Sequence, residues 1–424
     1  MIFKNSIVLG IFSILSVLLG IVRDRLLATQ VGVGPILDIY NAAFRLPDFL
    51  YALALAFVTA GTVVPFLTVE DRKGRMIDSR HKLSSISLFF GGSISLIGLV
   101  IAITLPLYTH LIVPGFTEEQ ITVFISVTRL MLLQPILIGL TSLISCFAQL
   151  KNHFVLYGIA PLGYSVGIIG GIIFLYPLYG VHGLIYGVLI GALFSFCIQI
   201  FSLRKAKMGE VFPYFSWKDV RDILRLGLPR TGVNVLSQLR VIFFTAFATT
   251  LGPGALSSYL FAQRITDAVQ QIIQQSVTTA SLPILSKEFV ESRFAEYKKV
   301  VKQYVLILGG VGLFASIALF MVQDIVIQIL YGSTSAHGSI AYFLTGFLIA
   351  LPLQMMIGYF TISLYSAKDT KSVLYANLIS TLVAVFACYA TRPLGSISLL
   401  YGIIAMAISN FLTISLLYAN KRFH

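Results

Sequence analysis

Long apolar segments recur along almost the whole chain and are separated by short polar connections. The apolar segments lie at residues 5–29, 36–69, 83–112, 120–150, 154–178, 181–203, 224–250, 253–285, 300–329, 339–365, 371–391 and 396–419. Each is long enough for an α-helix to cross a bilayer, which takes about 20 residues. Because only helices and closed barrels satisfy the backbone in lipid, the pattern predicts an all-α polytopic membrane protein with about twelve transmembrane helices.

The composition agrees with a membrane protein. The chain is 57% hydrophobic and 11% charged, whereas soluble domains are about 25% charged. The net charge of +13 comes largely from alternate connections, such as 70–82, 204–225 and 286–303. By the positive-inside rule these connections and both termini are expected in the cytoplasm. No nucleic-acid-binding motif accompanies the positive charge, so nucleic acid is not an expected partner.

An internal repeat divides the chain into two halves. The segment "GVGPILDIYNAAFRLPD" (32–48) matches "GPGALSSYLFAQRITD" (252–267). Six predicted helices separate the matched segments, so both halves have the same orientation in the membrane. We predict two six-helix lobes at residues 1–207 and 208–424, with residues 208–223 forming an amphipathic cytoplasmic linker.

Charged residues also occur inside the predicted helices, where each costs at least about 2.5–3.5 kcal/mol near the bilayer centre. Such residues usually face a bundle interior or a water-filled cavity, so we expect them to bind the substrate. Spacings of three residues, as in Arg45–Asp48 and Arg264–Asp267, allow contact on one helix face. The candidate substrate-binding residues are Arg23, Asp24, Asp38, Arg45, Asp48, Arg240, Arg264 and Asp267.

Arginine predominates among these charges, which indicates an anionic substrate. A guanidinium stays protonated and holds a phosphate with a planar fork of donors. A proton relay would favour Asp, Glu or His, and the six histidines lie in or beside the connections. No nucleophile–base arrangement or metal-ligand spacing is visible, so we predict a transporter rather than an enzyme, without metal or cofactor. The alternative is that the charged pairs only neutralise each other locally.

Four segments have a distinctive sequence: "LLGIVRDRLLATQVGVGPILDIYNAAFRLPDFL" (18–50), "VPGF" (113–116), "LPRTGVNVLSQL" (228–239) and "LPILSKEF" (282–289). They resemble the lipid II flippases (the MurJ/MviN family) of the multidrug/oligosaccharidyl-lipid/polysaccharide (MOP) exporter superfamily. The resemblance extends over essentially the whole chain. It implies a monomeric flippase that moves a polyprenyl-pyrophosphate-linked peptidoglycan precursor from the inner to the outer leaflet by alternating access, with membrane lipids around it.

The resemblance also implies roles for individual residues. Arg23 and Asp24 match the Arg-Asp pair of the family's first helix, and Asp38 matches its helix 2 aspartate. Arg45 falls on a basic position nearby. Arg264 matches the key arginine of helix 8, and Asp267 matches an acid one turn further on.

The chain departs from the family pattern in several places. Val17 stands where an arginine is often found, and Gln263 replaces the acid before the helix 8 arginine. The segment "YALALAF" (51–57) replaces a basic pair and a glutamate. Two further helices that line a groove for the lipid tail in many members have no counterpart among the twelve predicted segments.

Three alternatives to a lipid II flippase follow. A related polyprenyl-linked glycan could be the cargo. A cation-coupled multidrug exporter of the same superfamily would transport organic cations, which the surplus of intramembrane arginine disfavours. A membrane scaffold without transport would tolerate alanine at all the intramembrane charges.

Overall fold

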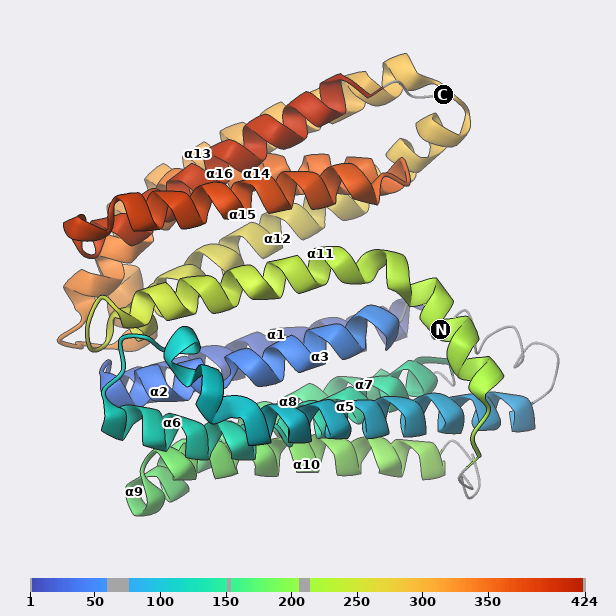
Figure 1. The fold of residues 1–424 in the computed structure, drawn as a ribbon. Helices are drawn as coiled ribbons and strands as arrows, with labels where there is room; N and C mark the ends of the chain where they lie inside the picture. The colour runs from blue at the N-terminus through green and yellow to red at the C-terminus, as the bar shows by residue number, and fades with distance from the viewer. Residues whose placement is uncertain (1, 59–75, 151–153, 206–213, 422–424) are drawn as a thin grey trace. The chain divides into compact units, whose positions relative to one another are not determined.

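The computed structural model describes residues 2–58, 76–150, 154–205 and 214–421. Every regular element among these residues is a helix, and the described part of the chain contains no strand (Figure 1). Nine helical segments among them are long and apolar enough to cross a membrane. The predicted all-α polytopic membrane fold is therefore confirmed.

The three other predicted crossings are also helical where the structure describes them. The first forms α1 (Ile2–Leu26), which ends with three consecutive charged residues, and the eighth forms α12 (Ala255–Val290). The second forms α2 (Pro35–Ala43) and α3 (Arg45–Val58), which are separated at Phe44. The rest of that segment lies outside the described residues.

The chain divides into two compact units, which are described separately below. The N-terminal unit comprises Met1–Leu239 with Leu330–Gly332, and the C-terminal unit comprises Arg240–Ile329 with Ser333–His424. The boundary falls inside α11 (Trp217–Thr249). The lobes predicted from the repeat, 1–207 and 208–424, stay a prediction.

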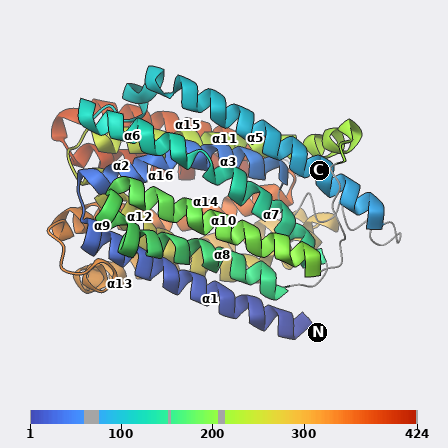
Figure 2. The same cartoon turned by 90° about the horizontal axis from the view of Figure 1, so that it is seen from below.

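The N-terminal unit is a bundle in which α8 and α10 run side by side (Figure 2). The turn η1 (Leu27–Val31) lies between α1 and α2. After α3 the unit contains, in chain order, α5 (Met76–Ile112), α6 (Glu118–Met131), α7 (Gln134–Leu150), α8 (Phe154–Gly170), η2 (Gly171–Leu175), α9 (Tyr176–Tyr179) and α10 (Val181–Lys205). Both η1 and η2 are π-helical turns that continue the helix before them.

Glycines let α8 and the turn η2 that continues it approach α10 until their backbones touch. A Cβ atom built on Gly171 would lie 2.6 Å from the Cα of Gly187 and 3.3 Å from the carbonyl oxygen of Gly183. Gly167 and Gly191 make a similar contact further along the two helices. In lipid, where burial of apolar surface drives little association, such close packing is a main source of helix–helix stability. The seam therefore fixes α8 against α10.

The residues just before α11 are hydrogen-bonded to α5. The Ser84 hydroxyl oxygen accepts a hydrogen bond from the Tyr214 backbone N–H (3.0 Å), and that of Ser85 accepts one from the Ser216 N–H (2.9 Å). The Trp217 ring packs edge-on against Phe89 at 5.7 Å. These bonds explain why the first part of α11 belongs to the N-terminal unit. Residues 208–213 of the predicted linker lie outside the described residues.

The C-terminal unit contains a second bundle, in which α14 packs against both α12 and α16. After α11 it comprises α12, α13 (Phe294–Tyr331), α14 (His337–Ser366), α15 (Thr370–Ala390), the 3₁₀ turn η3 (Arg392–Leu394) and α16 (Ile397–Ala419). Figure 1 shows α15 and α16 side by side, as their extensive contacts require.

An ion pair joins the end of α16 to the start of α15. The Lys421 Nζ lies 2.6 Å from Asp369 Oδ2, and both side chains are mostly buried. Asp369 also caps α15, because its carboxylate accepts hydrogen bonds from the backbone N–H and the hydroxyl of Ser372. Burial opposes ionisation of Asp369, but the hydrogen bonds from Lys421 and Ser372 outweigh it and lower the pKa of this carboxyl below its ordinary value.

The matched segments of the repeat have the same local structure. Gly32 and Gly252 both have positive φ angles, of 81° and 108°, which glycine adopts without strain. Each precedes a helix, and Tyr40 and Tyr259 are both buried on it. The segments differ at Phe44, where α2 ends, because α12 continues unbroken through the corresponding position. This local agreement supports the repeat.

Candidate functional site

The candidate residues are distributed over both units. Arg23, Asp24, Asp38, Arg45 and Asp48 belong to the N-terminal unit, and Arg240, Arg264 and Asp267 belong to the C-terminal unit. All of them lie in helices. That both sets bind the substrate stays a prediction, so the two sets are described one after the other.

The charges at the end of α1 form an ion pair. Arg23 Nε donates to Asp24 Oδ1 at 2.9 Å, and the two side chains are 25% and 13% exposed. A buried guanidinium with a carboxylate beside it keeps its charge at a lower desolvation cost than an isolated one. The ion pair therefore explains in part how α1 tolerates charged residues in an apolar segment.

Arg23 also lies within electrostatic range of two tyrosines. These are Tyr40 on α2 and Tyr164 on α8. Tyr164 in turn interacts with Tyr40 and Asp48 and accepts a hydrogen bond from the Gln134 amide at 3.1 Å. Side chains from α1, α2, α3, α7 and α8 thus form one polar group inside the N-terminal unit. We call Arg23, Asp24, Tyr40, Asp48, Gln134 and Tyr164 the N-terminal polar cluster.

Asp38 and Arg45 lie on the elements that carry this cluster. Asp38 is 2% exposed in the first turn of α2, where the positive end of the helix dipole stabilises a carboxylate. Arg45 begins α3 and is half-buried. The break at Phe44 places the arginine at a helix start rather than in the middle of a continuous helix. Both positions fit a role at an intramembrane polar site.

Arg240 is engaged within the C-terminal unit. Its Nη1 donates to the side-chain oxygen of Asn377 on α15 at 3.2 Å, and the guanidinium interacts electrostatically with Tyr259 on α12. The Asn377 amide also donates to the Val373 carbonyl at 2.9 Å, which orients its oxygen towards Arg240. Arg240 therefore links α11 to α15.

Arg264 and Asp267 lie one turn apart on α12. The Arg264 guanidinium carbon is 5.7 Å from the centroid of the Phe261 ring, within the range of a cation–π contact. Asp267 is exposed on α12. The spacing of three residues allows the two side chains to touch, and a contact between them stays a prediction.

Three polar residues were not among the sequence candidates. Tyr164 and Gln134 extend the N-terminal polar cluster, and Asn377 binds Arg240. A search of the apolar segments for buried amides and tyrosines as well as charges would have found them. No group of three or more His, Cys, Asp or Glu side chains in the described residues could hold a metal ion.

A family model and individual relatives point to the same protein family. A family model described as "Lipid II flippase MurJ" matches residues 27–423. A protein of Burkholderia cenocepacia named "Lipid II flippase MurJ" is 23% identical over 405 residues, which cover 92% of this chain and 78% of the relative.

Solved structures of two kinds share the fold. The structure described as "Lipid II flippase MurJ, inward closed conformation" has a TM-score of 0.79 at 21% identity and covers 98% of this chain and 88% of its own. An inward-facing multidrug resistance MATE family transporter of the MOP superfamily has a TM-score of 0.76 at 18% identity, covering 96% of both chains. At these identities the structures show the fold alone.

Proposed function

The chain belongs to the lipid II flippase MurJ family, and on that premise we propose that it moves lipid II from the inner to the outer leaflet of the bacterial inner membrane. The family match over residues 27–423 carries this proposal. The arginines in the membrane helices support it independently, because they suit a pyrophosphate-linked cargo. The proposed activity is transport without covalent chemistry.

The arginines give the proposal its chemistry. Arg23, Arg45 and Arg264 are the proposed ligands of the pyrophosphate, which they bind through charge-assisted hydrogen bonds. The sugar-peptide headgroup enters the polar interior with the pyrophosphate, while the polyprenyl tail stays in lipid. Arg240, already bonded to Asn377, contributes long-range positive potential and orients α11.

The acids explain how the empty protein tolerates these charges. Asp24 is already paired with Arg23 at 2.9 Å. Asp38, Asp48 and Asp267 are the other carboxylates that we propose balance the charge of the arginines. When the anionic cargo arrives, it competes with the carboxylates for the guanidinium groups. This exchange favours closure on the inner side and opening on the outer side, which is an alternating-access cycle.

The orientation follows from the basic connections. With both termini and the basic connections in the cytoplasm, the cargo enters from the leaflet in which lipid-linked precursors are made. The protein acts as a monomer, because each chain supplies both repeats.

Complementation tests the proposal in cells. A bacterium depleted of its own lipid II flippase should grow when it expresses the wild-type chain and should lyse when it expresses Arg264→Ala. Arg392→Ala is the matched control, since Arg392 is exposed in the turn η3, and it should support growth. Growth with Arg264→Ala at equal protein level contradicts the role of Arg264. Failure of the wild-type chain, with rescue of a strain lacking another polyprenyl-glycan flippase, would assign a different cargo.

A further inference from the structure

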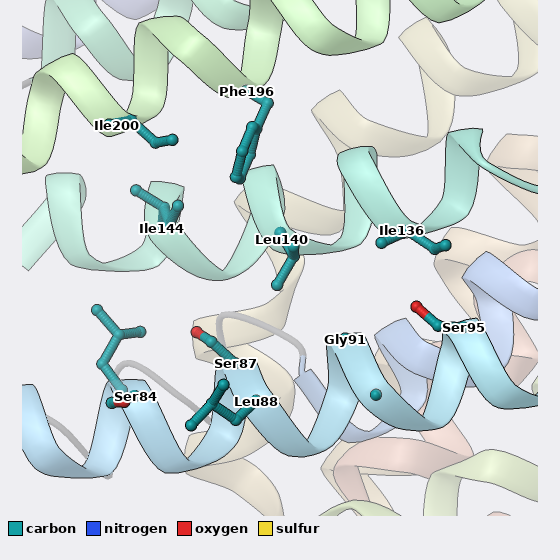
Figure 3. A pocket seen from close by; sticks show the side chains of 12 residues that line it. Ser84, Ser87, Leu88, Gly91, Ser95, Ile136, Leu140, Ile144, Phe196 and Ile200 are labelled. Atoms are coloured by element: carbon teal, nitrogen blue, oxygen red, sulfur yellow. The ribbon is translucent and has the colours of Figure 1, made fainter. Parts of the chain in front are cut away.

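An apolar groove in the N-terminal unit lies apart from the polar cluster. It has a volume of about 520 Å³ and is formed by α5, α7 and α10. Figure 3 shows Ile136, Leu140 and Ile144 of α7 above the α5 side chains, with Phe196 and Ile200 of α10 on the far side. None of the proposed substrate-binding residues lines it.

Small residues of α5 leave the space open. Ser87, Gly91, Gly92 and Ser95 line the groove where larger side chains would fill it. A Cβ atom built on Gly92 would meet nothing within 4 Å. All three helices carry membrane-spanning segments, so the medium around the groove is hydrocarbon. Its occupant is therefore a chain drawn from the bilayer.

The length of the groove identifies the kind of chain. Along α5 it extends from Leu83 to Ser95, which is about 18 Å at the rise of an α-helix. One leaflet contributes about 15 Å of hydrocarbon. The groove is therefore about one leaflet deep, which fits an acyl chain of a phospholipid, whereas a polyprenyl chain is much longer than one leaflet.

The charge at one end indicates the headgroup. Leu83 and Ser84 mark the end of the groove nearest the start of α5, and Lys82 directly precedes them. This end also carries the bonds from Ser84 and Ser85 to the start of α11. A lysine at the membrane surface attracts anionic lipid. We propose that the groove binds an acyl chain of an anionic glycerophospholipid, whose headgroup lies beside Lys82.

Photolabelling tests this site independently of any cargo. The full chain is placed in nanodiscs of phosphatidylcholine with a phosphatidylglycerol probe that carries a diazirine on its acyl chain. Label should concentrate on the groove-lining parts of α5 and α7 and fall several-fold in Gly92→Phe, which fills the groove. Gly310→Phe on α13 is the matched control, because a Cβ there also meets nothing within 4 Å, and it should keep the label. Lys82→Gln should reduce the preference for phosphatidylglycerol over phosphatidylcholine about fivefold.

Several results would overturn the proposal. Label on α5 and α7 no stronger than on the lipid-facing α13 means that ordinary bilayer contact explains it. Unchanged labelling in Gly92→Phe means that the chain lies elsewhere. A diazirine polyprenyl phosphate that labels the groove while the phosphatidylglycerol probe does not assigns the groove to the proposed cargo instead.

Discussion

The glycine contacts of α8 and η2 with α10 make the sharpest prediction about stability. In Gly171→Ala the new Cβ would lie 2.6 Å from the Cα of Gly187. An ordinary contact distance begins at 3.4 Å, so the helices must separate by the difference, 0.8 Å. A radial gap of that size forfeits about a quarter to a half of the dispersion energy of each contact along the seam. We expect a loss of about 1–3 kcal/mol in the free energy of unfolding.

Gly170→Ala is the matched control for this change. Gly170 is the preceding residue, with helical φ and ψ angles of −59° and −39°, and a Cβ there would meet nothing within 4 Å. Alanine has the higher helix propensity, so this variant should be neutral or more stable by up to about 1 kcal/mol. Both variants are measured by SDS-induced unfolding in mixed micelles. Equal free energies of unfolding for the two variants would refute the argument that backbone contact holds α8 to α10.

Two further predictions concern polar contacts. The Asp369 carboxyl has a lowered pKa in the folded state. Its ion pair with Lys421 therefore stabilises the fold above about pH 4, the ordinary pKa of aspartate. This stabilisation is lost as the pH falls through the lower pKa of the folded state. Asp369→Asn should therefore destabilise the protein by about 1–2 kcal/mol at pH 7. Thermal unfolding of the variant and the wild-type chain is followed from pH 7 to 3. A difference in stability between them that stays constant across this range would contradict the role of the ion pair. Tyr164→Phe removes the hydrogen bond from Gln134 and should cost about 1 kcal/mol. Gln134→Leu in the Tyr164→Phe background should add less than it does alone, and full additivity in a double-mutant cycle would show that the two residues do not interact.

The helices could be predicted from the sequence because lipid imposes a strong constraint on the backbone. An apolar run of about 20 residues must be a helix in a bilayer, so all twelve predicted segments correspond to helices where they are described. The break at Phe44 was not predicted, since the apolar pattern continues across it. The bonds from Ser84 to the start of α11 were also outside the reach of pattern analysis, because they join residues that are far apart in the chain.

The candidate site was predicted less completely than the fold. The charged residues could be predicted as candidates because burying a charge in hydrocarbon costs free energy. Among them, Arg23 forms an ion pair with Asp24. The same reasoning passed over Tyr164 and Asn377, because neutral polar side chains cost less to bury and stand out less in an apolar run. Helical spacing shows only that Arg264 and Asp267 can share a face of α12, so a contact between them stays a prediction.

Translocation in reconstituted vesicles tests the central claim most directly. Proteoliposomes that contain the purified chain and lipid II are assayed for the rate at which lipid II reaches the opposite leaflet. The wild-type chain and Arg392→Ala should translocate it at equal rates. Arg264→Ala should be slower by about tenfold or more, the effect of losing one charge-assisted contact worth about 1.5–3 kcal/mol. Equal rates for Arg264→Ala and the wild-type chain would contradict the claim that intramembrane arginine carries the pyrophosphate.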